Sequence, residues 1–369
     1  MHIPVNAPSL KGNEKRYLNE CIDSGWISSE GPFVARFERE FAATVERQHG
    51  VAVANGTAAL EVAVRALRLG PGDEVIMPSF TIISCCQAVV QSGATPVLVD
   101  SDPLTWNMDI AQVEARITPR TRAIMAIHIY GLATPMAPLQ ALAQRHGLRI
   151  IEDAAQAIGL THEGRPCGSF GDISIVSFYP NKHITTGEGG MVLTNDQELA
   201  DRCRTLANLC FQPQQRFVHE ELGWNYRMTN LQAAVGCAQL EQLPSHLRRK
   251  REIGRLYDQL LQGCPLQLPL AAAQGTENLY WVYGLVLPDD LPLTAAEVMK
   301  RLADQGIGCR PFFWPMHQQP VFQHMGLFPN HHLPVSERLA RRGFYLPSGL
   351  ALTDAQIHAV SAALKGILA

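Results

Sequence analysis

The chain has 369 residues, with 31 Lys and Arg against 34 Asp and Glu and a formal net charge of -3. This charge gives no electrostatic reason to expect nucleic acid or an anionic membrane as a partner. The length favours a large domain with a smaller one. No apolar run approaches the roughly 20 residues that span a bilayer, so we expect a soluble protein.

The nine cysteines favour a reducing compartment. None is spaced as CxxC and no signal peptide is seen, so a cytoplasmic protein is expected rather than a disulfide framework. We interpret Cys85 and Cys86 as small apolar packing residues. No metal site is expected, because His317 and the pair His331 and His332 lack the spacing of metal ligands.

The first 240 residues alternate helical and strand-like segments. Helical periodicity marks "GPFVARFEREFAATV" and "GTAALEVAVRALRLG". Short apolar runs follow, bounded by Gly, Pro or Asp: "DEVIMPS", "TPVLVD", "RAIMAIHIY", "LRIIED", "DISIVSFY" and "GGMVLTN". Near-continuous apolar strands that alternate with helices indicate an α/β domain, with a mainly parallel sheet covered on both faces.

The pattern changes from "MTNLQAAVGCAQLEQL" onward. A long helical stretch, about residues 228–263, is broken or bent near Pro244. A strand candidate "LYWVYGLVL", a helix "TAAEVMKRLADQG", a strand "IGCRPFF", a loop and a last helix "TDAQIHAVSAALKGIL" follow. We therefore predict a large domain at 1–240 and a small α+β domain at 241–369, joined by the long helix.

One turn could hold a phosphate. The chain lacks GxGxxG after its first strand and lacks GxxxxGK[ST], so neither a Rossmann dinucleotide site nor a P-loop is supported. In "VAVANGTAALEVAV" a strand instead turns through Asn55, Gly56 and Thr57 into a helix. Free N–H groups at a helix N-terminus bind phosphate, although simple helix capping by Asn or Thr fits the same pattern.

An acid and a lysine end two of the apolar strands. In "IIEDAAQAIG", Asp153 ends a buried strand where α/β sheets bind ligands, while Glu152 is interpreted as a cap for the next helix. Lys182 follows 29 residues later in "SFYPNKHITTGEGG". A lysine, a carboxylate and a phosphate-holding helix start match the needs of pyridoxal phosphate.

The sequence resembles the sugar aminotransferases of the DegT/DnrJ/EryC1/StrS family. The likeness spans nearly the whole chain and is carried by "NGTAAL", "IEDAAQA", "NKHITTGEGG" and "NYRMTNLQAA". It implies the aspartate-aminotransferase-like fold, fold type I of pyridoxal-phosphate enzymes. A narrower likeness, in "CIDSGWISS" and "RPFFWPMH", is to members that aminate GDP-4-keto-6-deoxymannose.

The resemblance implies a role for each matching residue. Lys182 would bond to the cofactor and shuttle the proton, Asp153 would pair with the pyridine nitrogen, and Gln156 would lie near the ring hydroxyl. The phosphate would contact Gly56, Thr57 and Ser177, and Asn225 would reach it from the other subunit of a homodimer. Substrate contacts are expected at Arg227, Ser28, Ser29 and His317, although Ser28 and Ser29 fit helix capping equally well.

Two positions depart from the family pattern. Ile82 stands where relatives often place an aromatic ring over the cofactor, which removes a stacking contact but leaves an apolar lid. Gln156 stands where many members acting on the GDP-linked sugar carry Glu. One branch replaces the lysine by histidine and dehydrates sugars, so Lys182 favours amination, and His183 is interpreted as packing or polar support.

The implied reaction has two halves. L-Glutamate converts pyridoxal 5'-phosphate to pyridoxamine 5'-phosphate, which then aminates the 4-keto carbon of a nucleotide-linked 6-deoxyhexose. UDP- or dTDP-linked sugars, a sugar dehydratase on the same cofactor, a noncatalytic regulator and a lectin-like sugar binder stay open as alternatives. Whether dimers pair into tetramers is also open, as is an O-antigen or antibiotic pathway.

Overall fold

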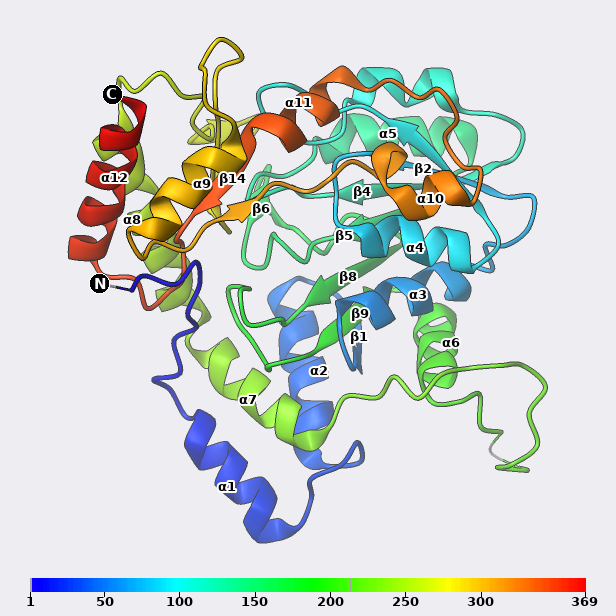
Figure 1. Ribbon diagram of the computed structural model, residues 1–369. Helices are drawn as coiled ribbons and strands as arrows, with labels where there is room; N and C mark the ends of the chain where they lie inside the picture. The colour runs from blue at the N-terminus through cyan, green and yellow to red at the C-terminus, as the bar shows by residue number, and fades with distance from the viewer. Residues whose placement is uncertain (1, 213) are drawn as a thin grey trace.

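A seven-stranded sheet forms the centre of the protein, in the order β1-β9-β8-β5-β4-β2-β3 (Figure 1). The computed structural model describes residues 2–212 and 214–369. The strands are β1 His49–Val53, β2 Glu74–Pro78, β3 Thr95–Val99, β4 Thr121–Ile127, β5 Arg149–Asp153, β8 Ile173–Ser177 and β9 Gly190–Thr194. β9 runs antiparallel to β1 and β8, and the other ladders are parallel. The predicted mainly parallel sheet is confirmed.

The two faces of this sheet are covered by separate apolar cores. Alternate residues of β4 show the division, because Met125 and Ile127 belong to one core and Ile124 and Ala126 to the other. The first core is covered by α3 Gly56–Ala66, α4 Ile83–Gln91 and α6 Gln197–Ala207. The second is covered by α2 Pro32–Thr44, α5 Met136–His146 and α7 Asn230–Glu241. Burial on both faces explains why the strands read as near-continuous apolar runs.

The long helical stretch consists of two helices. A capping box between Thr229 and Gln232 starts α7. The helix ends at Glu241, and α8 Leu243–Leu261 begins with Pro244 in its first turn, where the missing N–H costs no helical hydrogen bond. α7 packs on α1 Glu14–Ser24 and on α2, whereas α8 packs on α12 Asp354–Leu368.

The smaller unit contains a three-stranded sheet in the order β12-β14-β13. β12 Tyr283–Val286 and β13 Arg310–Pro311 lie within the two predicted strands and are shorter, and the central β14 Gly343–Leu346 was not predicted. α8, α12 and α9 Ala295–Asp304 contribute the apolar residues that pack with this sheet. Capping boxes at Thr294 and Thr353 start α9 and α12.

Two segments cross between the units. Ile3 pairs with Ile307 and packs in the core of the smaller unit. Conversely, α11 Pro334–Arg342 docks on the large sheet, where Asp100 accepts a hydrogen bond of 2.8 Å from the N–H of Ser336. We propose that the two units divide near residue 240, except that the segment around Ile3 belongs to the smaller unit and α11 belongs to the larger one.

Short elements complete the described chain: η1 Ile110–Gln112, η2 Glu114–Arg116, β6 Thr161–His162, β7 Arg165–Pro166, β10 Ala272–Ala273, β11 Thr276–Glu277, η3 Met316–Gln318 and α10 Pro320–His324. No helix within residues 2–212 and 214–369 is both long and apolar enough to cross a membrane.

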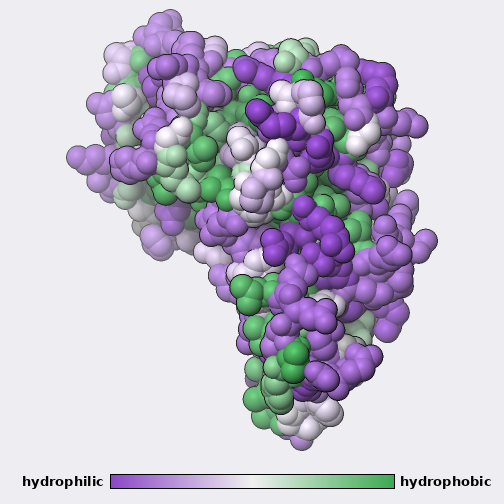
Figure 2. All heavy atoms as spheres, turned by 90° about the vertical axis from the view of Figure 1, so that its right-hand side faces the viewer, coloured by the Kyte–Doolittle hydropathy of each residue, from purple (hydrophilic) through white to green (hydrophobic). Residues whose placement is uncertain are grey.

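The molecule narrows at the end that carries α1 and α7, and apolar side chains gather on this lower lobe (Figure 2). Ile22, Trp26 and Ile27, in α1 and the turn that follows it, are 63%, 51% and 48% exposed. Phe217 and Leu222, in the segment between α6 and α7, are 80% and 85% exposed. Large apolar side chains gathered on a surface mark contact sites for other molecules.

Candidate active site

Four neighbouring strands each have one end at the same edge of the large sheet. Asp153 ends β5 and Ser177 ends β8, and these strands are paired in parallel. Gly190, at the start of β9, is opposite both Ser177 and Val53, the last residue of β1. A Cβ at Gly190 would lie 2.5 Å from the backbone oxygen of Asn55. The missing side chain therefore lets the turn after β1 approach the ends of β8 and β5.

The turn after β1 begins α3 with free backbone donors. Asn55 caps the helix, because its Oδ1 accepts a hydrogen bond of 2.8 Å from the N–H of Ala58. Gly56 and Thr57 are the first two helical residues, whose N–H groups have no partner within a helix. A Cβ at Gly56 would lie 2.8 Å from that of Ser177, so the Ser177 hydroxyl lies close to this helix start. The arrangement offers an anion two N–H groups and a hydroxyl.

The carboxylate of Asp153 is fixed by two donors. Oδ1 accepts a hydrogen bond of 2.9 Å from the N–H of Ala155, and Oδ2 lies 3.2 Å from the thiol of Cys85. Burial raises the pKa of this carboxyl, while the Ala155 N–H, the thiol and the Lys182 amine work in the opposite direction. Asp153 is only 2% exposed and faces the cavity described below.

The amine of Lys182 lies over an aromatic ring. Its Nζ is 3.9 Å from the ring centroid of Trp281, whose Nε1 donates a hydrogen bond of 2.9 Å to the backbone oxygen of Asn181. Burial away from water lowers the pKa of Lys182 to about 8, and the negative charge of Asp153 limits this shift. A neutral amine, the form that can accept a proton, is therefore well populated near pH 8.

These groups line one cavity of about 570 Å³. Seven of the residues predicted for cofactor binding and catalysis line it: Gly56, Thr57, Ile82, Asp153, Gln156, Ser177 and Lys182. Gln156 is anchored through its Oε1, which accepts a hydrogen bond of 2.9 Å from the N–H of Tyr130. Ile82, at the N-cap of α4, presents an apolar side chain to the cavity.

The other five predicted residues do not line this cavity. Asn225 is exposed, and its Oδ1 accepts a hydrogen bond of 3.0 Å from Nε of Arg227. Arg227 and Ser29 line a separate surface hollow, and Ser28 lies in the exposed turn before α2. Their roles stay predictions, and only for Asn225 does the prediction place the role in the site of a second subunit.

His317 also lies outside the cavity, and its predicted contact with the substrate stays a prediction. Its ring is only 3% exposed and lies outside the cavity, where its Nδ1 is 2.8 Å from the Ser79 hydroxyl and its Nε2 is 3.2 Å from Glu337. Both nitrogens are thus engaged in a hydrogen-bond network. Phe313, four residues earlier in the chain, does line the cavity.

Sequence reasoning missed several aromatic residues of the cavity. Trp281, Phe313 and Tyr345 come from the smaller unit, and no spacing pattern marked them, although Phe313 lies within the "RPFFWPMH" stretch. For Tyr226 the sequence did contain a signal of a site residue, because Tyr226 lies beside Asn225 in the "NYRMT" motif. Its hydroxyl donates a hydrogen bond of 2.6 Å to Glu61, another residue that lines the cavity.

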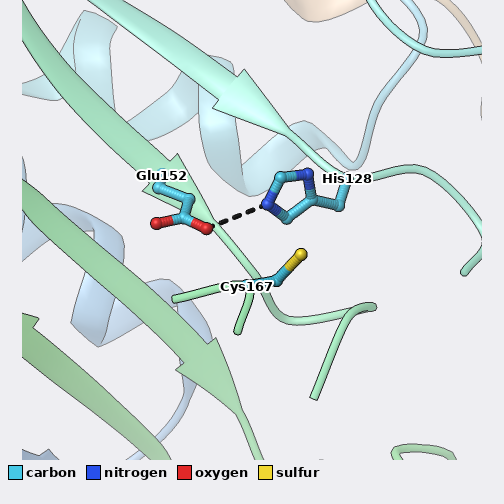
Figure 3. Close-up of side chains that lie close together, drawn as sticks. All are labelled: His128, Glu152 and Cys167. Atoms are coloured by element: carbon cyan, nitrogen blue, oxygen red, sulfur yellow. Dashed lines mark hydrogen bonds and ion pairs between the residues drawn. The ribbon is translucent and has the colours of Figure 1, made fainter. Parts of the chain in front are cut away.

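Glu152 has a different role from the predicted helix cap. No helix follows β5; the fully buried carboxylate instead accepts N–H hydrogen bonds from Gly168, Phe170 and Gly171 at 2.6, 2.8 and 3.1 Å. His128 lies 3.0 Å away on the other side (Figure 3). Burial alone would raise the pKa of Glu152, but the hydrogen bond with His128 and those from the N–H groups of Gly168 and Gly171 lower it to about 2.

The groups around Glu152 form a structural network. Cys167 completes a buried group that has the donor types of a metal site (Figure 3). However, Nδ1 of His128 accepts a hydrogen bond of 3.0 Å from the N–H of Thr134, and its Nε2 faces Glu152. With both ring nitrogens engaged, the group supports the turn at 167–171 and holds the end of β5 in place.

Replacing Glu152 by Gln is expected to destabilise the protein by about 2–4 kcal/mol, because an amide NH2 would face buried N–H donors. Urea unfolding at neutral pH measures this change. Glu163→Gln is the control, since Glu163 is exposed nearby, and it should change stability by less than about 0.5 kcal/mol. Equal unfolding midpoints for the two variants would refute the structural role.

Lys182→Met is expected to stabilise the cofactor-free protein by about 1–2 kcal/mol at pH 7, allowing for the partial exposure of the side chain. The pKa of about 8 lies below the usual 10.5, so the penalty for burying the charge is complete below pH 8. It disappears as the pH rises to 10.5. Urea unfolding at pH 7 and 10.5 tests this; the exposed Lys300→Met serves as control. A gain that persists at pH 10.5 would contradict it.

Comparison with known proteins places the chain in a family. Residues 8–365 match the DegT/DnrJ/EryC1/StrS aminotransferase family. GDP-perosamine synthase of Caulobacter vibrioides is 45% identical over 99% of this chain and 98% of its own. The Vibrio cholerae protein of the same name is 41% identical over 98% of both chains.

Solved structures agree with this placement. The S. venezuelae protein DesV, solved in complex with a ketimine intermediate, superposes with a TM-score of 0.89 at 37% identity and covers 96% of this chain and 94% of its own. DesI, solved in the presence of its TDP-sugar product, gives a TM-score of 0.90 at 32% identity over 100% of this chain and 93% of its own. The chain is therefore an aminotransferase that belongs to the DegT/DnrJ/EryC1/StrS family.

Proposed function

We propose that this enzyme transfers the amino group of L-glutamate to the 4-keto carbon of GDP-4-keto-6-deoxymannose, and so makes GDP-perosamine. Three relatives that bear the name GDP-perosamine synthase support this substrate, at 45%, 41% and 42% identity over nearly the full length. The observation that carries the proposal is the convergence of Asp153, Lys182 and the start of α3 on one cavity.

The residues of the cavity fit pyridoxal 5'-phosphate. The N–H groups of Gly56 and Thr57 and the hydroxyl of Ser177 suit its phosphate. Asp153 supplies a carboxylate for its pyridine nitrogen, and Lys182 supplies an amine for its aldehyde. Asp153 is buried without a salt bridge in the described chain, and a buried carboxylate of this kind fits a cationic ring nitrogen.

When bound, this cofactor withdraws the electron pair that is left when a proton leaves the carbon next to the reacting nitrogen. The remaining steps belong to the protein. In the first half-reaction, Nζ of Lys182 accepts the α-proton of glutamate. In the second half-reaction, the same amine delivers a proton to C4 of the sugar. Asp153 keeps the ring nitrogen protonated in both half-reactions.

The walls of the cavity complete this chemistry. Ile82 and the rings of Trp281 and Phe313 exclude water from the reacting atoms. Gln156 is held by the Tyr130 N–H and keeps its amide within the cavity. The lowered pKa of Lys182, about 8, makes its amine available as a base close to neutral pH.

We also propose a homodimer with shared active sites, located in the cytoplasm. The exposed Asn225 and the half-buried Arg227 lie outside their own cavity, next to Tyr226, which lines it. A second subunit placed against this segment and the apolar lower lobe would bring Asn225 to its phosphate site. The nine free thiols fit a reducing compartment.

An absorbance titration tests the proposed reaction. The enzyme would be converted to the pyridoxamine form with L-glutamate, freed of excess donor and mixed with GDP-4-keto-6-deoxymannose. Return of the absorbance band of the lysine-bound cofactor is expected. If the glutamate half-reaction proceeds and the band does not return, GDP-4-keto-6-deoxymannose is not the substrate. UDP- and dTDP-linked 4-keto sugars then become the candidates. Turnover without an amino donor would instead favour a dehydratase.

A further inference from the structure

A buried thiol lies against the carboxylate that faces the cofactor cavity. Cys85 belongs to the first turns of α4, and its Sγ is 3.2 Å from Oδ2 of Asp153. Thr81, just before this helix, donates its hydroxyl hydrogen to the same sulfur at 3.6 Å. Thr81 and Asp153 are 1% and 2% exposed, and Cys85 is fully buried. The three side chains thus form a short relay of hydrogen bonds shielded from water.

We propose that Cys85 is a positioning residue for the proposed reaction: its thiol donates to Asp153 and holds the carboxylate in the orientation that the cofactor ring requires. This inference rests on the proposed function. The Ala155 N–H holds Oδ1 and the thiol holds Oδ2, so the carboxylate plane is fixed while lone pairs remain available toward the cavity.

The surroundings keep this thiol a donor. Burial and the negative charge of Asp153 raise the pKa of Cys85 far above its usual value, so the sulfur stays protonated. The hydrogen bond from Thr81 polarises the S–H group and strengthens its donation. Lys182, after β8, is the cationic group that acts on Asp153 from a neighbouring segment. Cys85 adds a neutral donor from α4.

The neighbouring Cys86 offers a matched control. It is also fully buried, lies in the same helix and belongs to the same apolar core. The hydrogen bonds of the described residues include none from Cys86 to Asp153. Truncation of either thiol to alanine removes one sulfur from the same core, so the two variants should lose similar stability. Only Cys85→Ala should disturb the carboxylate.

Infrared spectroscopy of the cofactor-free protein tests the hydrogen bond itself. The S–H stretching band of Cys85 is isolated as the difference between wild type and Cys85→Ala. In the Asp153→Asn background, the same difference band is expected at higher frequency, because a neutral amide is a weaker acceptor than a carboxylate. An unchanged band would overturn the proposal. This measurement needs no cofactor, so it stands even if the proposed function fails.

The dissociation constant for pyridoxal 5'-phosphate tests the consequence. Cys85→Ala is expected to raise it about three- to tenfold, the range of one lost hydrogen bond, whereas Cys86→Ala should leave it within about twofold. Cys85→Val, which keeps the bulk without a donor, should bind as weakly as Cys85→Ala. Wild-type affinity in the valine variant, or equal losses in Cys85→Ala and Cys86→Ala, would overturn the proposal. Wild-type protein that binds no cofactor would refute the proposed function instead.

Discussion

Replacing Lys182 by alanine is expected to lower the rate of amino transfer by at least about 10³-fold, because it removes both the proposed attachment point of the cofactor and the amine proposed to move the proton. No nearby lysine can take over. Lys250 is buried with its Nζ donating to the backbone oxygens of Trp281 and Ser348 at 2.8 and 2.5 Å. Asp153 and the residues proposed to hold the phosphate are unchanged, so the variant should still bind the cofactor noncovalently.

Two measurements check this expectation. Stopped-flow absorbance follows the glutamate half-reaction in wild type and variant. Borohydride reduction followed by peptide mass analysis should find the cofactor on Lys182 in the wild type and on no lysine in Lys182→Ala. Lys250→Met is the matched control and should keep the label on Lys182. Appreciable turnover by Lys182→Ala, or a label on another lysine, would contradict the proposed role.

Much of the cavity could be predicted because its residues lie at strand ends with local signals. Asp153 ends an apolar run and Lys182 follows another, and parallel strands bring such ends to one edge of a sheet. The helix start at Gly56 is signalled by small residues directly after a strand. Local sequence therefore placed both ends of the predicted cofactor site, and the structure brings them to one cavity. Their chemical roles stay predictions.

What could not be predicted depends on contacts distant in sequence. β14 has four residues and directly follows α11, too short for a period-2 pattern to stand out. Glu152 is satisfied by backbone donors 16 to 19 residues further along the chain, which no local rule for helix caps anticipates. Trp281 reaches Lys182 from the smaller unit. Likewise, Cys85 looked like a packing residue until the fold placed Asp153 beside it.

Asp153→Asn is expected to lower kcat by about 10²- to 10³-fold, comparable to the loss of one preorganised electrostatic contact in other active sites. Asparagine has nearly the same shape, but it carries no charge to keep a proton on the ring nitrogen. The proposed phosphate contacts at Gly56, Thr57 and Ser177 do not involve Asp153, so cofactor binding should weaken far less than the rate.

Asp153→Asn should lower the rate but leave the free energy of unfolding unchanged or higher. Burial raises the pKa of Asp153, so the ionised carboxylate is disfavoured in the cofactor-free fold, and a neutral amide should leave stability unchanged or higher. Its neighbour Glu152, whose pKa is lowered to about 2, supplies the contrast: Glu152→Gln should lose stability and retain the rate per folded molecule. Measuring kcat and the urea midpoint for both variants separates the roles. If Asp153→Asn lost stability and kept its rate, Asp153 would be a structural acid like Glu152, and the proposed contact with the ring nitrogen would be wrong.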